Sequence, residues 1–215
     1  MKYLFCYGDS NTWGHIPSET LKGVFNRYEF DVRWPGVLQN ELGADYHVYE
    51  NGMKGRAAIY DDPGARGRCA QHDLPFALDI TSPLDLVILM LGGNDTKSGA
   101  GLDAIDITNG MKKLIKCVKH SRCGRDGKRP EILLISPPGS FGDMSKSCFR
   151  PFFDESSERR IAELPSLFRQ LAEREGTGFM DATEYAQRGI DGLHFTPESH
   201  ANLGRAIAER VRGMM

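Results

Sequence analysis

The stretch "LDLVILMLG", residues 84–92, decides the fold of this 215-residue chain. Its apolar residues follow one another without the alternation of polar and apolar residues that a half-exposed strand shows. The stretch "EILLISP", residues 131–137, has the same continuous apolar character. Strands of this kind are buried on both faces, which is typical of parallel sheets that helices cover on either side. The two stretches therefore predict a buried parallel sheet.

Three further runs complete a set of five predicted strands, at residues 2–8, 45–51, 84–92, 131–137 and 176–181. Between them, apolar residues recur at helical spacing within residues 34–42, 102–121, 161–171 and 203–211. Strands that alternate with helices predict the α/β class, here a three-layer α/β/α sandwich around a five-stranded parallel sheet. No linker or repeat divides the sequence, so residues 1–215 are predicted to form a single domain.

Composition excludes several classes of function. The chain is 40% hydrophobic and 26% charged, with a net charge of −2, and it has no basic stripe that would predict a nucleic-acid partner. Its apolar runs are too short for a membrane-spanning helix, and the segment before Gly8 is too short for a signal peptide. Five cysteines without a C-x-x-C pattern favour a reduced, cytoplasmic chain with no zinc site.

A possible nucleophile follows the first predicted strand, where "YLFCYG" gives way to "DSNT". Ser10 in this turn could be only the cap of a helix, the commonest role of such a serine. A serine nucleophile needs a base to remove its proton and a third group to hold that base. Asp191 and His194 in "DGLHF", three residues apart, could be that pair, although most D-x-x-H pairs in proteins are structural.

Two segments could supply hydrogen-bond donors for an oxyanion, each at the end of a predicted strand. Gly55 in "NGMKG" offers a backbone N–H that no side chain shields, and Asn94 in "GGND" offers a side-chain amide. Either segment alone could be an ordinary glycine-rich turn. The carboxyl ends of parallel strands meet at one edge of the sheet, where ligands bind in α/β folds. Ser10, Gly55, Asn94 and the Asp/His pair at that edge together favour catalysis.

These four segments, in this order, resemble the four sequence blocks of the SGNH hydrolases, also called GDSL-type esterases. The resemblance implies a flavodoxin-like sandwich, with Ser10 as nucleophile, His194 as base and Asp191 as the acid that orients it. It further implies an oxyanion hole made of the backbone N–H groups of Ser10 and Gly55 and the side chain of Asn94. No metal or cofactor is expected in such an enzyme.

A narrower resemblance is carried by "DVRWPGVLQNELGADY", "LDLVILMLGGNDTK", "SPP" and "DGLHFT". These stretches are similar to the bacterial arylesterase and acyltransferase branch of the family. The branch implies hydrolysis of short-chain acetyl-type or aryl esters, acyl transfer to alcohols, and homo-oligomers that include octamers. Residues 26–34 could form such an interface or a solvated flap. One departure from the GDSL name is Asn11 in place of leucine, which is expected to affect only local packing.

Other residues near the motifs have less certain roles. Trp13 could line an acyl pocket or pack in the core. Lys54 and Arg56 flank Gly55 and could meet an anionic substrate or simply lie at the surface. Asp9 and Asp95 are interpreted as structural acceptors. No metal-ligand grouping is expected among the remaining histidines, which are His15, His47, His72, His120 and His200.

Two alternatives to the short-chain esterase stay open. With the same catalytic residues, the chain could be a deacetylase of acetylated carbohydrates or a thioesterase. A non-enzymatic alternative is a flavodoxin-like module whose "GDSNT" turn cradles a phosphate or a flavin. The sequence disfavours that module, because it has neither G-x-G-x-x-G nor G-x-x-x-x-G-K-[ST] and Asp9 would lie beside the phosphate.

Overall fold

The computed structural model describes all of residues 1–215. Five parallel strands form one sheet in the order β2-β1-β3-β4-β5. The strands are Lys2–Gly8 (β1), Tyr46–Gly52 (β2), Leu86–Met90 (β3), Glu131–Ser136 (β4) and Gly178–Asp181 (β5). At the carboxyl end of β1, Gly8 lies opposite Gly52 of β2 on one side and Met90 of β3 on the other. The predicted five-stranded parallel sheet is thus confirmed.

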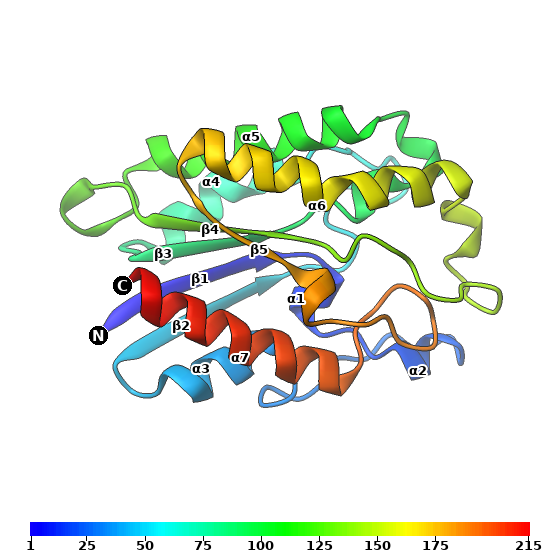
Figure 1. Ribbon diagram of the computed structural model, residues 1–215, viewed down its shortest axis with the longest axis horizontal. Helices are drawn as coiled ribbons and strands as arrows, with labels where there is room; N and C mark the ends of the chain where they lie inside the picture. Colours follow the sequence, from blue (N-terminus) through cyan, green and yellow to red (C-terminus); the bar gives the residue numbers. More distant parts are fainter.

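Helices cover both faces of this sheet (Figure 1). Helices α3 and α7 pack together on one face, while α4, α5 and α6 form the layer on the other. The helices are Ser10–Trp13 (α1), Pro17–Thr20 (α2), Trp34–Leu42 (α3), Ala70–Thr81 (α4), Ala104–Ser121 (α5), Glu155–Glu175 (α6) and Pro197–Met214 (α7). The arrangement is the predicted three-layer α/β/α sandwich.

Strand β1 shows why both faces need a cover. Successive side chains of a strand point to opposite faces. Phe5 and Tyr7 belong to the core beneath α4, α5 and α6, whereas Leu4 and Cys6 belong to the core beneath α3 and α7. All four are fully buried. An apolar strand of this kind is stable only between two layers, because neither face can be left in water.

Two glycines allow helix α1 to pack closely against the carboxyl ends of β1 and β2. A Cβ atom added to Gly52 would lie 2.1 Å from the backbone nitrogen of Trp13. A Cβ atom added to Gly8 would lie 2.1 Å from Oγ1 of Thr12. Side chains at these two positions would therefore push α1 away from the sheet. The position of Ser10, the first residue of α1, depends on this close approach.

Helix α4 is the main element that the sequence pattern did not predict. Its buried residues, Ala70, Leu74 and Leu78, form a narrow stripe, and one of them is only an alanine. Pro75 lies inside the helix and removes one backbone hydrogen bond. The stripe packs into the same core as Phe5 and Tyr7, and this tertiary contact outweighs the weak local signal.

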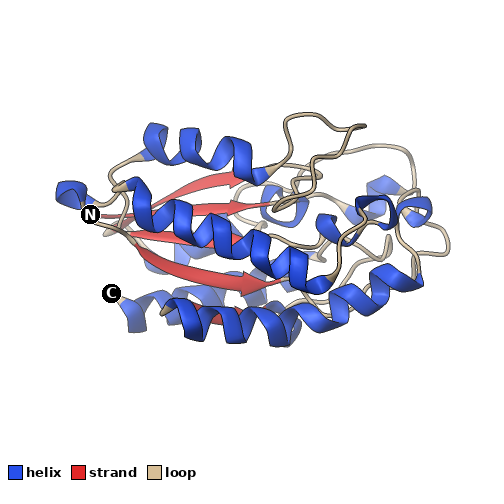
Figure 2. Ribbon diagram, turned by 90° about the horizontal axis from the view of Figure 1, so that it is seen from above, coloured by secondary structure: helices blue, strands red, loops and turns tan.

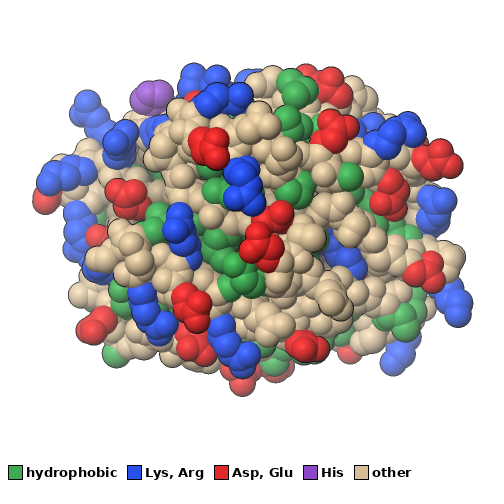
Figure 3. Space-filling model, viewed as in Figure 1, with side chains coloured by type: hydrophobic (Ala, Val, Ile, Leu, Met, Phe, Trp, Pro, Cys, Tyr) green, Lys and Arg blue, Asp and Glu red, His purple; other side chains and the backbone are tan.

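The two ends of the sheet differ in character. Figure 2 shows the strands pointing toward the end where the long loops gather, while both chain termini lie at the opposite end. Residues 13–33 and 138–156 are largely irregular: they contain the last residue of α1, the short α2, a 3-10 turn at Arg150–Phe152 and the start of α6. No helix combines the length and the apolar character needed to cross a membrane. On the face seen in Figure 3, basic and acidic side chains are interspersed.

Candidate active site

Ser10 is held in place by the turn that begins helix α1. Asp9 caps this helix, and its carboxylate accepts a hydrogen bond of 2.9 Å from the backbone N–H of Asn11. The turn directs Ser10 toward the loop between β5 and α7, where it contacts His194. That loop ends at Thr196, whose side chain caps α7. Ser10 is 6% exposed, so its hydroxyl lies in a largely enclosed place.

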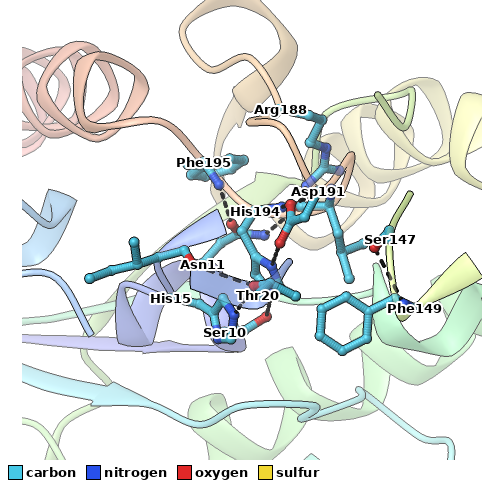
Figure 4. Close-up of polar contacts among 12 residues, drawn as sticks. Ser10, Asn11, His15, Thr20, Ser147, Phe149, Arg188, Asp191, His194 and Phe195 are labelled. Atoms are coloured by element: carbon cyan, nitrogen blue, oxygen red, sulfur yellow. Dashed lines mark hydrogen bonds and ion pairs between the residues drawn. The ribbon is translucent and has the colours of Figure 1, made fainter. Parts of the chain in front are cut away.

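A chain of hydrogen bonds joins Ser10, His194 and Asp191 (Figure 4). Oγ of Ser10 lies 3.0 Å from Nε2 of His194, and Nδ1 of His194 lies 2.6 Å from Oδ2 of Asp191. The other carboxylate oxygen of Asp191 accepts the backbone N–H groups of Leu193 and His194. With Nδ1 donating to the carboxylate, Nε2 is the acceptor that faces the serine hydroxyl.

The carboxyl of Asp191 is ionised at neutral pH although it is fully buried. Burial alone would raise its pKa. The hydrogen bond and charge of His194, together with the two backbone N–H groups, outweigh burial and hold the pKa of Asp191 well below its usual range. The anion therefore both fixes the tautomer of His194 and favours its protonated form when it accepts a proton.

Gly55 and Asn94 lie beside Ser10 on the wall of one cavity of about 260 Å³. Gly55 has φ +74°, a conformation that favours glycine, and its backbone N–H has no acceptor within the protein. Nδ2 of Asn94 donates 3.0 Å to the backbone carbonyl of Arg56, which fixes the amide while its second hydrogen stays free. The arrangement brings two possible donors to the surroundings of the serine hydroxyl.

Aromatic rings form much of the remaining cavity wall. The side chains that complete it are His15, Phe25, Lys54, Arg68, Lys97, Phe149, Phe152, Phe153 and Leu193. Trp13, which the sequence offered as a pocket wall, does not line this cavity. Its ring lies beneath two cations instead, with Nζ of Lys54 4.7 Å and Cζ of Arg27 5.6 Å from the ring centroid. A larger depression of about 430 Å³ beside β5 and α7 has no serine, cysteine or histidine in its wall.

His15 is a neighbour of the site that sequence reasoning missed. Its ring stacks on that of His194, with centroids 3.9 Å apart, and its Nε2 lies 2.6 Å from Oγ1 of Thr20. Burial and the charge of His194 lower the pKa of His15 to about 3, so it is neutral at neutral pH. Contrary to expectation, His15 does belong to a potential metal-ligand group, since its ligand atom lies within 4.8 Å of those of Asp191 and His194.

Asn11 also has a larger role than local packing. Its side-chain oxygen accepts the backbone N–H of Phe195 at 3.0 Å, and its amide donates to the carbonyl of Leu193 at 3.4 Å. Arg188 donates to the same carbonyl at 2.7 Å. Asn11 therefore joins the turn that carries Ser10 to the loop that carries His194, an interaction between residues far apart in the sequence.

Arg56 and Asp95 are buried parts of the framework. Arg56, predicted to be available to substrate or solvent, is 2% exposed, donates to the carbonyl of Gly8 and forms an ion pair of 2.9 Å with Asp73. It does not line the cavity, because its guanidinium points into the sheet edge over the ring of Tyr7. Asp95 accepts three backbone N–H groups, those of residues 58–60, which confirms its structural role.

Comparisons with known proteins agree with this geometry. The sequence profile of the GDSL-like Lipase/Acylhydrolase family matches residues 6–201. The native aryl esterase of M. smegmatis is 37% identical, with both chains covered completely and a TM-score of 0.93. Est24, a carbohydrate acetylesterase from Sinorhizobium meliloti, is 35% identical over the whole of both chains, with a TM-score of 0.94. A comparison with curated proteins found no match.

Proposed function

This chain belongs to the GDSL-like lipase/acylhydrolase family and is a carboxylic ester hydrolase, and from this premise we propose that it cleaves short-chain acyl esters through an acyl-enzyme on Ser10. The observation that carries the proposal is the chain of hydrogen bonds from Ser10 through His194 to Asp191, at 3.0 and 2.6 Å. A buried carboxylate, a histidine in a fixed tautomer and a hydroxyl in one line are the parts of a serine hydrolase.

Ser10 attacks the ester carbonyl while Nε2 of His194 takes the proton of the hydroxyl. The charge of Asp191 stabilises the imidazolium that forms, without itself becoming protonated. The negative charge on the tetrahedral intermediate is stabilised by the backbone N–H groups of Ser10 and Gly55 and by the amide of Asn94. His194 then protonates the departing alcohol. Water, activated by the same imidazole, releases the acyl group and regenerates the hydroxyl.

The cavity supports a small acyl or aryl group as the apolar part of the substrate. Its volume of about 260 Å³ and its phenylalanine rings suit a short acyl chain or one aromatic ring. The similar solved proteins are named as an aryl esterase and a carbohydrate acetylesterase, so aryl esters and acetylated carbohydrates are the first substrates to test. Thioesters, and alcohols as acyl acceptors in place of water, use the same steps.

The decisive experiment is covalent labelling of Ser10. Wild-type protein should react with a fluorophosphonate probe and hydrolyse p-nitrophenyl acetate and butyrate faster than longer esters. Ser10→Ala should lose the label and nearly all turnover, because no other hydroxyl is paired with a histidine and carboxylate in this way. Ser18→Ala, at an exposed serine of α2, is the matched control and should behave as wild type. A folded Ser10→Ala protein that keeps wild-type activity would overturn the proposal.

We also propose that the chain self-associates through the segment that includes residues 26–34. Large apolar side chains are exposed within and beside it, namely Val24, Phe25 and Phe30, at 41–46% exposure. Exposed apolar side chains grouped on one segment are typical of interaction surfaces. Light scattering after size exclusion should give a mass of several 24.0 kDa subunits, and Phe30→Asp should lower it. The five free cysteines support a reducing, cytoplasmic location for this assembly.

A further inference from the structure

We propose that the ester cleaved at this site carries a negatively charged group, a carboxylate or a phosphate, which pairs with Lys54 and Arg68 on the cavity wall. The inference rests on the proposed function and specifies its substrate class. The negative group could belong to the acyl part or to the alcohol part of the ester, and the experiment below separates these two sources.

The cavity wall has three cations and no carboxylate. Lys54, Arg68 and Lys97 line it together with Ser10, and neither an aspartate nor a glutamate does. Lys97 is already neutralised, because its Nζ lies 2.8 Å from Oδ2 of Asp62. The positive charge that stays available to a substrate is therefore that of Lys54 and Arg68.

Lys54 is half-buried and has no carboxylate within ion-pair distance. Its ammonium group lies 4.7 Å from the centroid of the Trp13 ring and 5.8 Å from that of Phe25. Aromatic faces attract a cation without cancelling its charge. The two rings thus hold the ammonium group at the cavity while its full charge is available to an anion.

Arg68 is held in a similar way, by a neutral partner. Its NH1 donates to the backbone carbonyl of Lys54, and no ion pair occupies its other donors. The side chain packs against Gly55, since a Cβ atom added there would lie 3.5 Å from Cδ and NH1 of Arg68. The guanidinium is therefore next to a proposed oxyanion donor. Its planar fork of donors matches a carboxylate or a phosphate.

Two other arginines of this loop-rich end differ from Arg68, because they are paired. Arg27 and Arg33 both form ion pairs with Glu50, at 2.7 and 2.8 Å. Lys54 and Arg68, by contrast, line the cavity that contains Ser10 and have no carboxylate within ion-pair distance. Charges in a partly enclosed cavity act through less water, so their attraction for an anion is stronger than at an open surface. A negatively charged substrate group would therefore be attracted to Lys54 and Arg68.

The test uses two pairs of esters that match in size and differ in charge. The first pair, 4-nitrophenyl hemiglutarate and 4-nitrophenyl pentanoate, places the anion on the acyl part. The second pair, 3-acetoxybenzoate and 3-acetoxybenzamide, places it on the leaving group. In at least one pair, kcat/KM for the anionic ester should exceed that for the neutral ester by about tenfold, which is about 1.4 kcal/mol. The pair that shows the preference identifies the source of the charge.

Variants then assign the preference to the two cations. Lys54→Gln and Arg68→Gln should each lower the anionic-to-neutral ratio about fivefold or more, and Arg68→Lys should restore part of it. Raising the salt concentration should reduce the wild-type ratio. Arg66→Gln, at an exposed cation that does not line the cavity, is the matched control and should leave the ratio unchanged.

Binding separates this inference from the proposed function. The uncleaved esters are titrated calorimetrically into Ser10→Ala protein, which needs no catalysis, and the anionic member of a pair should bind more tightly. Equal affinities and equal kcat/KM values within both pairs would overturn the inference, while Ser10-dependent hydrolysis of the neutral esters would still support the esterase. If the wild-type protein hydrolysed none of these esters, while Ser10→Ala protein still bound the anionic member of a pair more tightly, the esterase would be overturned and the anion site would stand.

Discussion

Asn94 differs from the other proposed oxyanion donors because its contribution depends on a side chain. If its amide contacts the developing charge, the bond is stronger in the transition state than in the bound substrate. Asn94→Ala should then lower kcat by roughly 100- to 1000-fold, about 2.7–4 kcal/mol, with little change in KM. Asn94→Asp should be at least as harmful, since it puts a negative charge beside the oxyanion.

Stability must be separated from catalysis in this experiment. Nδ2 of Asn94 also donates to the backbone carbonyl of Arg56, so the alanine variant leaves that carbonyl without its partner. Turnover is therefore measured per active site, with folding checked by circular dichroism. Asn109→Ala, at an exposed asparagine of α5, serves as the control. Near-normal kcat in folded Asn94→Ala protein would exclude Asn94 from the oxyanion hole and leave Ser10 and His194 unaffected.

At the level of single residues, motif spacing identified the residues that now meet at the cavity, but not their supports. Ser10, Gly55 and Asn94 each follow a strand end, so a one-dimensional pattern places them on one edge of the sheet. His15 and Asn11 act across loops instead. Asn11 contacts Phe195, 184 positions further along the chain, and no local pattern encodes such a contact. The surroundings of Trp13 and Arg56 could not be predicted from the sequence for the same reason.

At the level of elements, the turn that carries Ser10 and the loop that carries His194 meet at the site, and Asn11 joins them. Asn11→Ala removes the acceptor of the buried Phe195 N–H and should lower the free energy of unfolding by about 1–3 kcal/mol. The loop that carries His194 then loses the contacts with Asn11 that help to hold it beside the turn of Ser10, so kcat should fall by roughly tenfold, in line with the sensitivity of rates to small misplacements. Chemical denaturation and steady-state kinetics measure the two effects.

A conservative variant distinguishes positioning from general destabilisation. Asn11→Asp keeps an oxygen that can accept the Phe195 N–H, and it should recover more activity than Asn11→Ala does. Asn40→Ala, at an exposed asparagine of α3, is the matched control for loss of an amide. If Asn11→Ala lowered stability while kcat per active site stayed at the wild-type value, the positioning role would be wrong.

The helices show how far periodicity alone predicts elements. Stripes of large apolar residues in α3, α5, α6 and α7 were strong enough to predict these helices, and the observed bounds extend or trim them by a few residues. Helix α4 presents one alanine and two leucines to the core and contains a proline, so its local pattern is weak. It is stabilised by burial against the sheet, a tertiary effect that a single sequence window does not contain.

For the molecule as a whole, two buried histidines make stability depend on pH. Burial and the charge of His194 lower the pKa of both His15 and His200 to about 3. In the unfolded chain each titrates near its usual pKa of about 6.5. Below that pH the unfolded chain binds protons that the folded protein does not, so the free energy of unfolding falls as pH falls. Between pH 7.5 and pH 5.0 each histidine should contribute a loss of about 2 kcal/mol.

Two buried carboxyls act in the opposite direction, so the wild-type change is a sum. Burial raises the pKa of Asp9 and Asp95, and a raised carboxyl pKa favours the folded state as the pH falls.

Differences between variants and wild type isolate the contribution of the histidines. His15→Phe keeps a ring against His194, and His200→Gln keeps an acceptor for the backbone N–H of Trp34, which now donates to Nδ1 of His200 at 3.3 Å.

Urea denaturation at pH 7.5 and pH 5.0 measures the effect. Each variant should lose about 2 kcal/mol less than wild type between the two pH values, whatever its stability at pH 7.5. His120→Gln provides the control, because His120 is exposed and its replacement should leave the difference unchanged. The same loss in wild type and in both variants would show that His15 and His200 take up protons in the folded protein, and that their burial does not govern its acid sensitivity.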